Sequence, residues 1–259
     1  QVNLSQAASF LKSRGYDPTD KVLAEYGVGY APMGNVALRQ LTSQGYSNQI
    51  LTDVGVLGKS QDGRSYDFFR DRVMFPFYDL SGRVVAFSGR IVTPNENTGK
   101  YVNTGETPLF RKGKHLFGLF QAKRAIARDG FAYLVEGQFD VMTLHKYGVE
   151  NVIGGSGTAF TDDQVRLIMR FTQSVVMIYD ADAAGMKAAV KNCELLLKAG
   201  ATVRCVRLPK GQDPDSYARL CKDKTRQKLI EATESFPKAM KRMLVPRGCK
   251  EEEVIASAM

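Results

Sequence analysis

The sequence lacks long apolar runs and is poor in the residue types that bind zinc. No stretch approaches 18 apolar residues without a charge, and the N-terminus lacks the short apolar core of a signal peptide, so we expect a soluble cytoplasmic protein. The four cysteines are nowhere spaced as C-x-x-C, and there are only two histidines. A zinc site is therefore not expected, and the cysteines are interpreted as reduced structural residues.

Charge is unevenly distributed along the 259 residues, of which 44% are hydrophobic and 24% are charged. Residues 1–128 carry 17 Lys or Arg and 10 Asp or Glu, a net charge of +7, whereas residues 129–200 carry 6 and 9, a net charge of −3. A basic region attracts polyanions and an acidic region needs cations, which indicates an enzyme that handles nucleic acid or nucleotides through a metal ion. A basic surface with no partner explains the charge alone equally well.

Three acidic turns follow runs that have the pattern of buried strands. The runs are residues 131–135, 175–179 and 202–208, and segments of helical period come after the first two. Strands that alternate with helices form a parallel sheet, and ligands bind beyond the carboxyl ends of its strands. We therefore expect an α/β fold with the acidic residues gathered at that edge. They are Glu136 and Asp140, Asp180 and Asp182, and Asp213 and Asp215.

These acidic turns predict a site for a divalent cation. Carboxylates close together raise one another's pKa, and a cation with oxygen ligands, Mg²⁺ in most cells, relieves the repulsion. Asp180 and Asp182 stand two residues apart in one turn, and Glu136 and Asp140 stand four apart on one helix face. Each turn taken singly also fits a simple helix cap. The glycines after residue 153 lack the Lys-Ser/Thr of a P-loop, so they indicate close backbone packing or a tight turn.

The N-terminal half is expected to contain a hairpin and a cationic loop. Residues 72–78 and 83–90 have the pattern of two strands around the turn D-L-S-G, and Pro76 indicates that the first is an edge strand or contains a bulge. The polar segment 93–114 mixes basic and aromatic residues, a combination that binds a nucleic-acid backbone and stacks on bases, although a solvated lid loop also fits. Residues 216–259 are expected to be mainly helical.

Several motifs resemble a known family. E-G-Q-F-D (136–140), followed by D-A-D-A-A-G (180–185), resembles the Toprim domain of primases, type IA and II topoisomerases and some nucleases. Further motifs resemble, in order, the catalytic core of bacterial DnaG-type primases over residues 5–220. They are F-L-K-S-R-G (10–15), G-V-G-Y-A-P (27–32), R-D-R-V-M-F-P-F (70–77), G-R-V-V-A-F-S-G-R (82–90), K-Y-V-N-T-G-E-T (100–107), F-R-K-G-K-H-L-F-G-L (110–119) and D-P-D (213–215).

The resemblance implies synthesis of RNA primers on single-stranded DNA by metal-dependent nucleotidyl transfer. It implies Mg²⁺, replaceable by Mn²⁺, as the cofactor and ribonucleoside triphosphates as substrates. With the charge pattern, it predicts a mixed α/β N-terminal subdomain (1–128), a Rossmann-like Toprim domain (129–212) and a C-terminal helical segment (213–259). Glu136, Asp180 and Asp182 would be catalytic. The metal ligands would be Glu136, Asp140, Asp180, Asp182, Asp213 and Asp215, and nucleotide or template would bind Arg72, Arg90, Lys100, Asn103 and Lys112.

The sequence departs from the family in small and large ways. Ala181 stands where the family commonly has Gly, and Gln138 where it has an aromatic or other residue, which affects substrate preference more than catalysis. The family's zinc ribbon and helicase-binding domain are missing and the chain begins without Met, so we expect a monomeric core fragment. It would bind template and RNA–DNA hybrid but reach the replicative helicase only through an absent domain. A Toprim nuclease and a non-catalytic nucleic-acid-binding module are the two alternatives.

Overall fold

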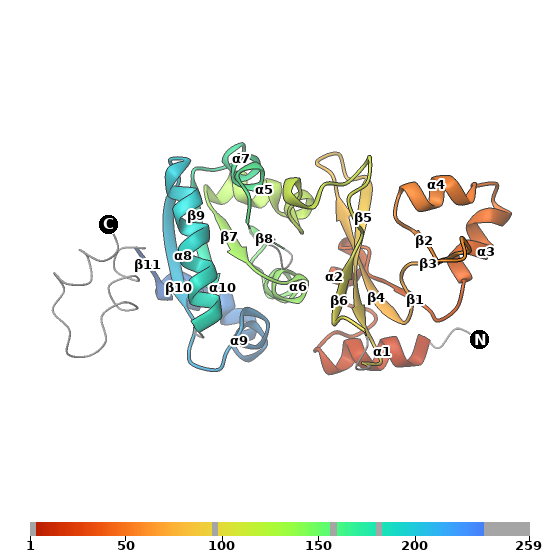
Figure 1. The fold of residues 1–259 in the computed structure, drawn as a ribbon. Coiled ribbons are helices and arrows are strands. Elements are labelled where there is room, and N and C mark those ends of the chain that lie inside the picture. The colour runs from red at the N-terminus through yellow and green to blue at the C-terminus, as the bar shows by residue number, and fades with distance from the viewer. Residues whose placement is uncertain (1–3, 95–97, 156–159, 180–182, 236–259) are drawn as a thin grey trace. The chain divides into compact units, whose positions relative to one another are not determined.

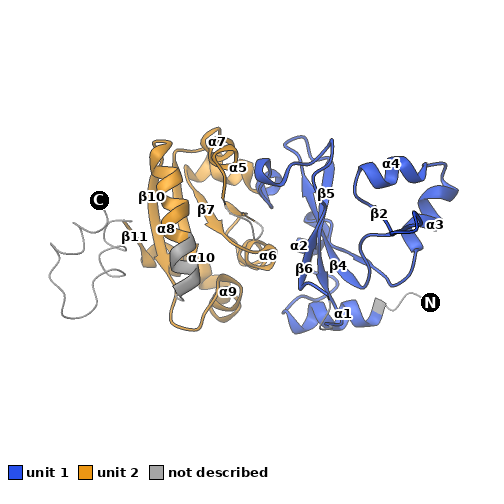
Figure 2. Ribbon diagram, in the orientation of Figure 1, with its two compact units in different colours: residues 1–121 blue, residues 122–259 orange. Residues whose placement is uncertain are grey.

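The computed structural model of the protein describes residues 4–94, 98–155, 160–179 and 183–235. The chain forms two compact units, residues 1–121 (unit 1) and residues 122–259 (unit 2), which Figure 2 shows in different colours. The three-domain division expected from the sequence stays a prediction. Within the described ranges, no helix has the length and apolar character needed to cross a membrane.

Unit 1 is built on a four-stranded antiparallel sheet with the strand order β1-β4-β5-β6 (Figure 1). The predicted hairpin is present as β4 and β5, and the turn between them contains Gly82 with a φ of 85°. A two-stranded ribbon, β2 with β3, is also present, and the sequence pattern does not predict it. The strands are β1 (Gly29–Ala31), β2 (Leu57–Lys59), β3 (Ser65–Asp67), β4 (Arg72–Tyr78), β5 (Val84–Ile91) and β6 (Tyr101–Asn103).

The position of Pro76 corrects one part of the sequence expectation. β4 has β1 on one side and β5 on the other, so it is not an edge strand. The pairing with β1 ends at Met74, so a proline beyond that residue interrupts no ladder with β1. The expected irregularity is present next to it, as a register shift between Phe77 and Tyr78.

The core of unit 1 contains a cluster of buried aromatic rings. Phe75 and Phe77 of β4 pack against Phe117, with ring centroids 6.3 and 5.6 Å apart, and Phe77 packs against Phe110 at 5.2 Å. Phe110 and Phe117 come from the segment after β6, so their burial holds that segment against the sheet. The helices are α1 (Leu4–Ser13), α2 (Lys21–Glu25), α3 (Val36–Ser43), α4 (Asn48–Asp53) and the 3-10 helix η1 (Lys112–Lys114).

Unit 2 is built on a five-stranded sheet with the order β11-β10-β9-β7-β8. The strands β7 to β10 are parallel and β11 is antiparallel, which confirms the predicted class of an α/β fold with a Rossmann-like sheet. Figure 1 shows α8 lying along β9 and β10, and these elements are in contact. The strands are β7 (Ala132–Val135), β8 (Val152–Gly154), β9 (Ser174–Tyr179), β10 (Thr202–Arg207) and β11 (Thr233–Ser235).

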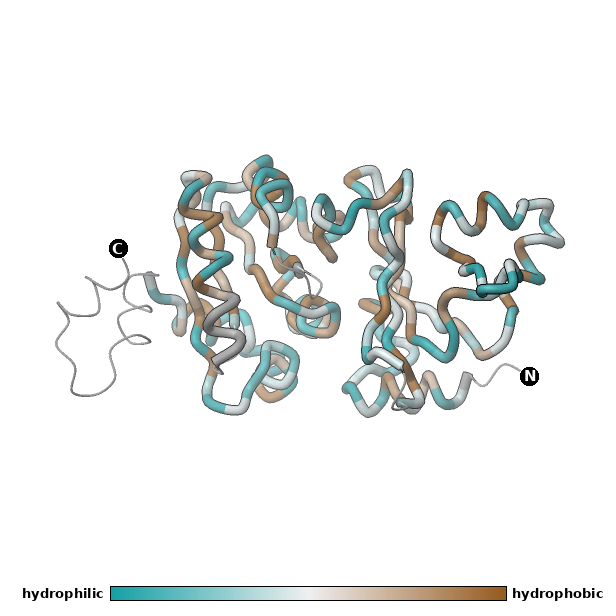
Figure 3. The backbone as a smooth tube through the Cα atoms, in the orientation of Figure 1, coloured by the Kyte–Doolittle hydropathy of each residue, from teal (hydrophilic) through white to brown (hydrophobic). Residues whose placement is uncertain are grey.

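The helices of unit 2 form two contacting groups. α7 contacts α8, whereas α9 contacts both α6 and α10, and right-handed crossovers place the two groups on opposite faces of the sheet. In α7 the buried residues Val165 and Ile168 lie on one face, whereas α6 is buried along most of its length, from Gln138 to Leu144. Figure 3 shows hydrophobic and hydrophilic residues in both units. The helices are α5 (Leu119–Asp129), α6 (Gln138–Lys146), α7 (Asp162–Met169), α8 (Ala183–Lys198), α9 (Pro214–Cys221), the 3-10 helix η2 (Lys222–Lys224) and α10 (Thr225–Ala232).

Two short strands lie where the sequence predicts other structure. β6 lies inside the expected loop 93–114 and pairs with the edge of β5, and β11 lies inside the expected helical region and pairs with the edge of β10. Each has three residues, which is too short for a period of two to be visible in the sequence. Both strands exist because a neighbouring strand offers an open edge, a tertiary effect that overrides local propensity.

Candidate functional site

The carboxyl end of β7 lies at the switch point of the unit 2 sheet. The chain continues from β7 to β8 on one side and from β9 to β10 on the other, so β7 and β9 are neighbours where the strand order reverses. Ligands bind at this point in open α/β sheets. Glu136 directly follows β7, and its side chain is exposed. Asp180 and Asp182, which follow β9 along the chain, lie outside the described residues.

The backbone of β8 packs closely against the Glu136 turn. A Cβ atom on Gly154 would lie 3.8 Å from the carbonyl oxygen of Glu136, 3.6 Å from that of Gly137 and 2.9 Å from a methyl group of Val141. The last distance is shorter than a normal contact, so glycine at position 154 is what allows β8 to approach the start of α6.

Hydrogen bonds tie the first acidic turn to the third. Oδ2 of Asp140 accepts the Gly137 N–H at 2.9 Å and thereby caps α6, while Oδ1 accepts the Asp215 N–H at 3.2 Å. The Asp215 carboxylate, in a residue that is 2% exposed, accepts the hydroxyl of Thr143 on α6 at 2.7 Å. The starts of α6 and α9 are therefore held together, and Glu136 stands directly before this junction.

Asp213 and Asp215 also stabilise α9 itself. Asp213 accepts the Ser216 N–H at 2.6 Å, and Pro214 occupies the first helical position, where its missing N–H has no consequence. Oδ2 of Asp215 lies 3.1 Å from Nη2 of Arg219, an ion pair without hydrogen-bond geometry. Asp140, Asp213 and Asp215 thus have structural roles in the described chain, and their role as metal ligands stays a prediction.

The chemistry of the Glu136 turn fits a hard divalent cation. Its donors are carboxylate oxygens, the ligands that Mg²⁺ and Mn²⁺ prefer in proteins. Within the part of the chain that the structure describes, no group of three or more His, Cys, Asp or Glu side chains is arranged to hold a metal ion. Asp180 and Asp182, which lie outside the described residues, are needed to complete the predicted set of metal ligands.

Arg90 of β5 is a buried cation that has no carboxylate partner among the described residues. It is 8% exposed, and its Nε and Nη1 atoms are buried without a hydrogen bond. Its guanidinium carbon lies 5.1 Å from the ring centroid of Tyr101 and 5.9 Å from that of Phe10. Burial lowers the pKa of Arg90, but a guanidinium keeps its charge at neutral pH. Aromatic rings supply no counter-charge, so the site favours an anion.

Polar side chains share the face of the sheet on which Arg90 lies. Arg90 pairs with Tyr101 and Ser88 with Asn103 across β5 and β6, and paired residues of an antiparallel sheet point to the same side. Oδ1 of Asn103 is also buried without a hydrogen bond. Lys100 directly precedes β6 and its side chain is exposed. The structure therefore places Arg90 and Asn103 on one face of the sheet. The binding of nucleotide or template by Arg90, Lys100 and Asn103 stays a prediction.

Arg72 and Lys112 have different surroundings. Arg72 is 5% exposed, and its guanidinium donates to the carbonyl oxygen of Gly89 at 2.9 Å and to that of Gly99 at 3.1 Å. These bonds direct its donors to the backbone instead of a ligand. Lys112 lies in η1, where its backbone N–H donates to Glu106 at 3.0 Å and partial burial lowers the pKa of its ammonium group.

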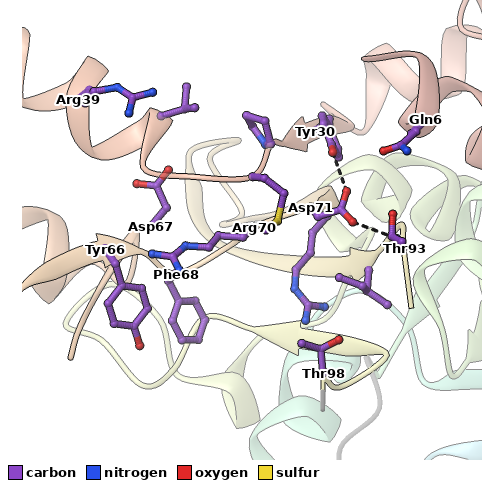
Figure 4. Close-up of a pocket in the computed structure, with 15 residues that line it drawn as sticks. Gln6, Tyr30, Arg39, Tyr66, Asp67, Phe68, Arg70, Asp71, Thr93 and Thr98 are labelled. Carbon is purple, nitrogen blue, oxygen red and sulfur yellow. Dashed lines mark hydrogen bonds between the residues drawn. The ribbon is translucent and has the colours of Figure 1, made fainter. Parts of the chain in front are cut away.

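A cavity of about 870 Å³ in unit 1 is lined by basic, acidic, aromatic and aliphatic side chains, among them Arg70, Tyr66 and Asp67 (Figure 4). The guanidinium of Arg70 lies 4.8 Å from the ring centroid of Tyr66, and its Nη2 donates to Asn35 at 2.9 Å while its Nε is buried without a partner. Sequence reasoning missed Arg70, although it belongs to the same motif as Arg72. Asp71 between them has a φ of 51°, which breaks the alternation that strand periodicity assumes.

Two family models match the chain. The model described as the DNA primase catalytic core, N-terminal domain, matches residues 1–123, and a Toprim-like model matches residues 133–218. The first therefore covers the sheet with Arg90, and the second covers the switch point with Glu136.

Known DNA primases are similar to most of the chain. The DNA primase of Aquifex aeolicus is 38% identical over 237 residues, which are 91% of this chain and 47% of that protein. The chain spans less than half the length of the curated relatives that it matches. A DNA primase domain from Pseudomonas aeruginosa has a TM-score of 0.82 at 34% identity, over 92% of this chain and 75% of that one. The DnaG primase catalytic domain bound to ssDNA also has a TM-score of 0.82 at 34% identity, over 95% of this chain and 80% of that one. The chain belongs to the family of bacterial DnaG-type DNA primase catalytic cores.

Proposed function

We propose that this chain makes short RNA primers by joining ribonucleoside triphosphates in the order that a single-stranded DNA template sets. The observation that carries the proposal is the buried guanidinium of Arg90 on the β5–β6 face, with two donors that no described residue satisfies. Leaving a buried donor without a partner costs about 1–3 kcal/mol, more for a charged group. A phosphate oxygen supplies both the acceptor and the negative charge that this site needs.

The cavity in unit 1 supports an unpaired strand as the template. Tyr66, Phe68 and the Arg70 guanidinium offer flat faces along its wall (Figure 4), and the exposed side chain of Met33 adds apolar surface. Bases stack on such faces only when they are not already stacked in a duplex, so the wall favours single-stranded DNA. One structurally similar relative was solved bound to ssDNA.

The acidic turns supply the second half of the proposed activity. Glu136, Asp180 and Asp182 are the proposed holders of Mg²⁺, with Asp140, Asp213 and Asp215 as proposed secondary ligands. When bound, divalent cations of this kind lower the pKa of an attacking hydroxyl and stabilise charge on the phosphoryl centre and the departing pyrophosphate.

The protein's own residues bind and orient the nucleotide in this proposal. Lys100 and Lys112 offset charge on the triphosphate, and Asn103 and Arg90 fix the backbone of the strand. Asp140 and Asp215 keep the Glu136 turn in place, because they tie together the starts of α6 and α9. The product of the reaction is an RNA–DNA hybrid.

A single assay separates this function from its alternatives. The chain is mixed with single-stranded DNA, labelled ribonucleotides and Mg²⁺ or Mn²⁺, and both the RNA made and the integrity of the template are measured. The proposal predicts template-dependent RNA that is lost in the Asp180→Asn variant. Degradation of the template would identify a nuclease, and salt-sensitive binding with neither product nor metal dependence would identify a binding module.

A further inference from the structure

Asp71 joins three strands of unit 1 at the edge of the cavity. Its φ of 51° is a left-handed conformation that is uncommon for residues with a side chain, and its carboxylate is nearly buried, with the residue 7% exposed. That carboxylate accepts the hydroxyl of Tyr30 on β1 at 2.7 Å and the N–H of Thr93, just after β5, at 3.1 Å (Figure 4). Its backbone carbonyl accepts the N–H of Val92 at 2.9 Å.

Arg72, the next residue, binds the other side of the same β5–β6 connection. Both of its terminal nitrogens lie 3.1 Å from the carbonyl oxygen of Gly99, and one also donates to Gly89 on β5 at 2.9 Å. A Cβ atom on Gly89 would lie 2.9 Å from Cδ of Arg72, so glycine at this position lets the arginine lie across β5.

The two sides of this connection lead directly to the predicted nucleic-acid contacts. Residues 91–93 form the outgoing stem and residues 98–101 the returning stem. They are bonded to each other where the Ile91 N–H donates to the carbonyl oxygen of Lys100 at 3.1 Å. The outgoing stem begins one residue after Arg90, and the returning stem contains Lys100 and Tyr101. Asp71 therefore holds one stem and Arg72 holds the other.

We propose that Asp71 and Arg72 are positioning residues that fix both stems, and so hold Arg90, Lys100 and Tyr101 in the arrangement that binds single-stranded DNA. This inference rests on the proposed function of the β5–β6 face. Arg72 is given this positioning role in place of direct contact with nucleotide or template, because the arginine is buried and its donors reach backbone carbonyls. Asp71 also lines the cavity, but in this proposal it acts through the stems.

Two substitutions of Asp71 separate its bonds from its backbone conformation. Glycine adopts a positive φ without strain, so Asp71→Gly removes both side-chain bonds while it relaxes the backbone. Asparagine tolerates a positive φ, and its amide can accept from Thr93 N–H and donate to the Tyr30 oxygen. Asp71→Asn therefore keeps a hydrogen bond to each of these residues. Lys222→Gly is the matched control, because Lys222 in unit 2 has a φ of 50°.

The experiment measures the stems directly and nucleic-acid binding separately, with the full chain. Amide hydrogen exchange without nucleic acid reports the Val92 and Thr93 N–H groups, and binding of single-stranded DNA is measured over a series of salt concentrations. We expect Asp71→Gly to speed exchange at Thr93 and weaken DNA binding, each by about ten-fold, the scale of one charge-assisted hydrogen bond. The salt dependence should also become less steep. Asp71→Asn should restore both properties, and Lys222→Gly should change neither.

The results that would contradict the positioning role of Asp71 differ from those that would contradict the proposed function. Unchanged exchange at Thr93 in Asp71→Gly, or unchanged DNA affinity and salt slope while the wild-type chain binds DNA, would overturn the positioning role. If the wild-type chain shows no salt-sensitive DNA binding, the proposed function fails. The exchange rates then decide by themselves whether Asp71 holds the stems.

Discussion

Replacing Arg90 with methionine should make the free protein more stable and its binding to single-stranded DNA weaker. The opposite signs follow from the surroundings of Arg90. Two of its buried donors have no hydrogen-bond partner, which is unfavourable in the free protein and becomes favourable only when an anion binds. If Arg90 served only to pack against its neighbours, the same change would lower the stability of the protein and leave DNA binding unchanged.

The size of the effect follows from the contacts of Arg90. Each unsatisfied buried donor costs about 1–3 kcal/mol, whereas each of the two ring contacts returns about 0.5–1 kcal/mol. Methionine keeps favourable contacts with both rings. We expect the free energy of unfolding to rise by about 1–4 kcal/mol, with Tm rising by about 2–4 °C for each kcal/mol. Loss of one phosphate contact should make the slope of log affinity against log salt less steep by about 0.7.

Thermal unfolding without nucleic acid and DNA binding between about 50 and 200 mM salt measure the two effects. Arg204→Met is the matched control, because Arg204 in unit 2 also lies over a ring, 5.4 Å from the centroid of Phe131, and donates to Ser174 at 3.4 Å. It should leave the DNA affinity and the salt slope unchanged. A destabilised Arg90→Met variant with normal DNA binding would refute the reasoning.

Three further predictions concern other residues. Glu136→Gln should lower RNA synthesis by at least about 100-fold with unchanged DNA affinity, whereas the exposed Glu150→Gln should lower neither, as a primer assay and a binding titration would show. The pKa of Tyr30 is raised to about 12 by burial and by Asp71. The unfolded chain therefore loses the hydroxyl proton at a lower pH than the folded chain, so the free energy of unfolding should fall between pH 10 and 12. Denaturant unfolding of the Tyr30→Phe variant should show a smaller fall over this pH range than the wild-type chain. Thr143→Val should lower the free energy of unfolding by about 1–3 kcal/mol, because a buried Asp215 oxygen loses its donor, and the exposed Thr202→Val should change it by less than about 0.5 kcal/mol.

The parallel sheet and the place of Glu136 directly after β7 are predictable from the sequence because they follow from local patterns. Buried parallel strands are continuous apolar runs, and the turns after them carry the acids, so Glu136 is found at the end of β7 as expected. The strand order β11-β10-β9-β7-β8 is not predictable in this way, because it depends on pairing between distant segments.

The roles of the basic residues were harder to predict, because they depend on packing between distant segments. Arg72 and Arg90 look alike in the sequence, yet one donates to backbone carbonyls and the other has buried donors without partners. No local pattern reports this difference. The left-handed conformation of Asp71 likewise appears only in the folded chain, where Arg70, Asp71 and Arg72 all line the cavity.

The acidic residues show the same limit. Asp140 and Asp215 were expected to bind metal or to cap a helix, and a cap and a link between α6 and α9 account for their hydrogen bonds in the described chain. An aspartate that caps a helix and one that binds a cation follow a strand at the same spacing, so the sequence cannot separate the two roles.

The most direct test of the central claim is the sequence of the RNA product. An RNA oligonucleotide annealed to single-stranded DNA is extended by the chain with ribonucleotides and Mg²⁺, on two templates that differ at defined positions. The account predicts extended RNA whose added residues change as the complement of each template. Addition of the same residues on both templates, or no addition at all, would contradict it.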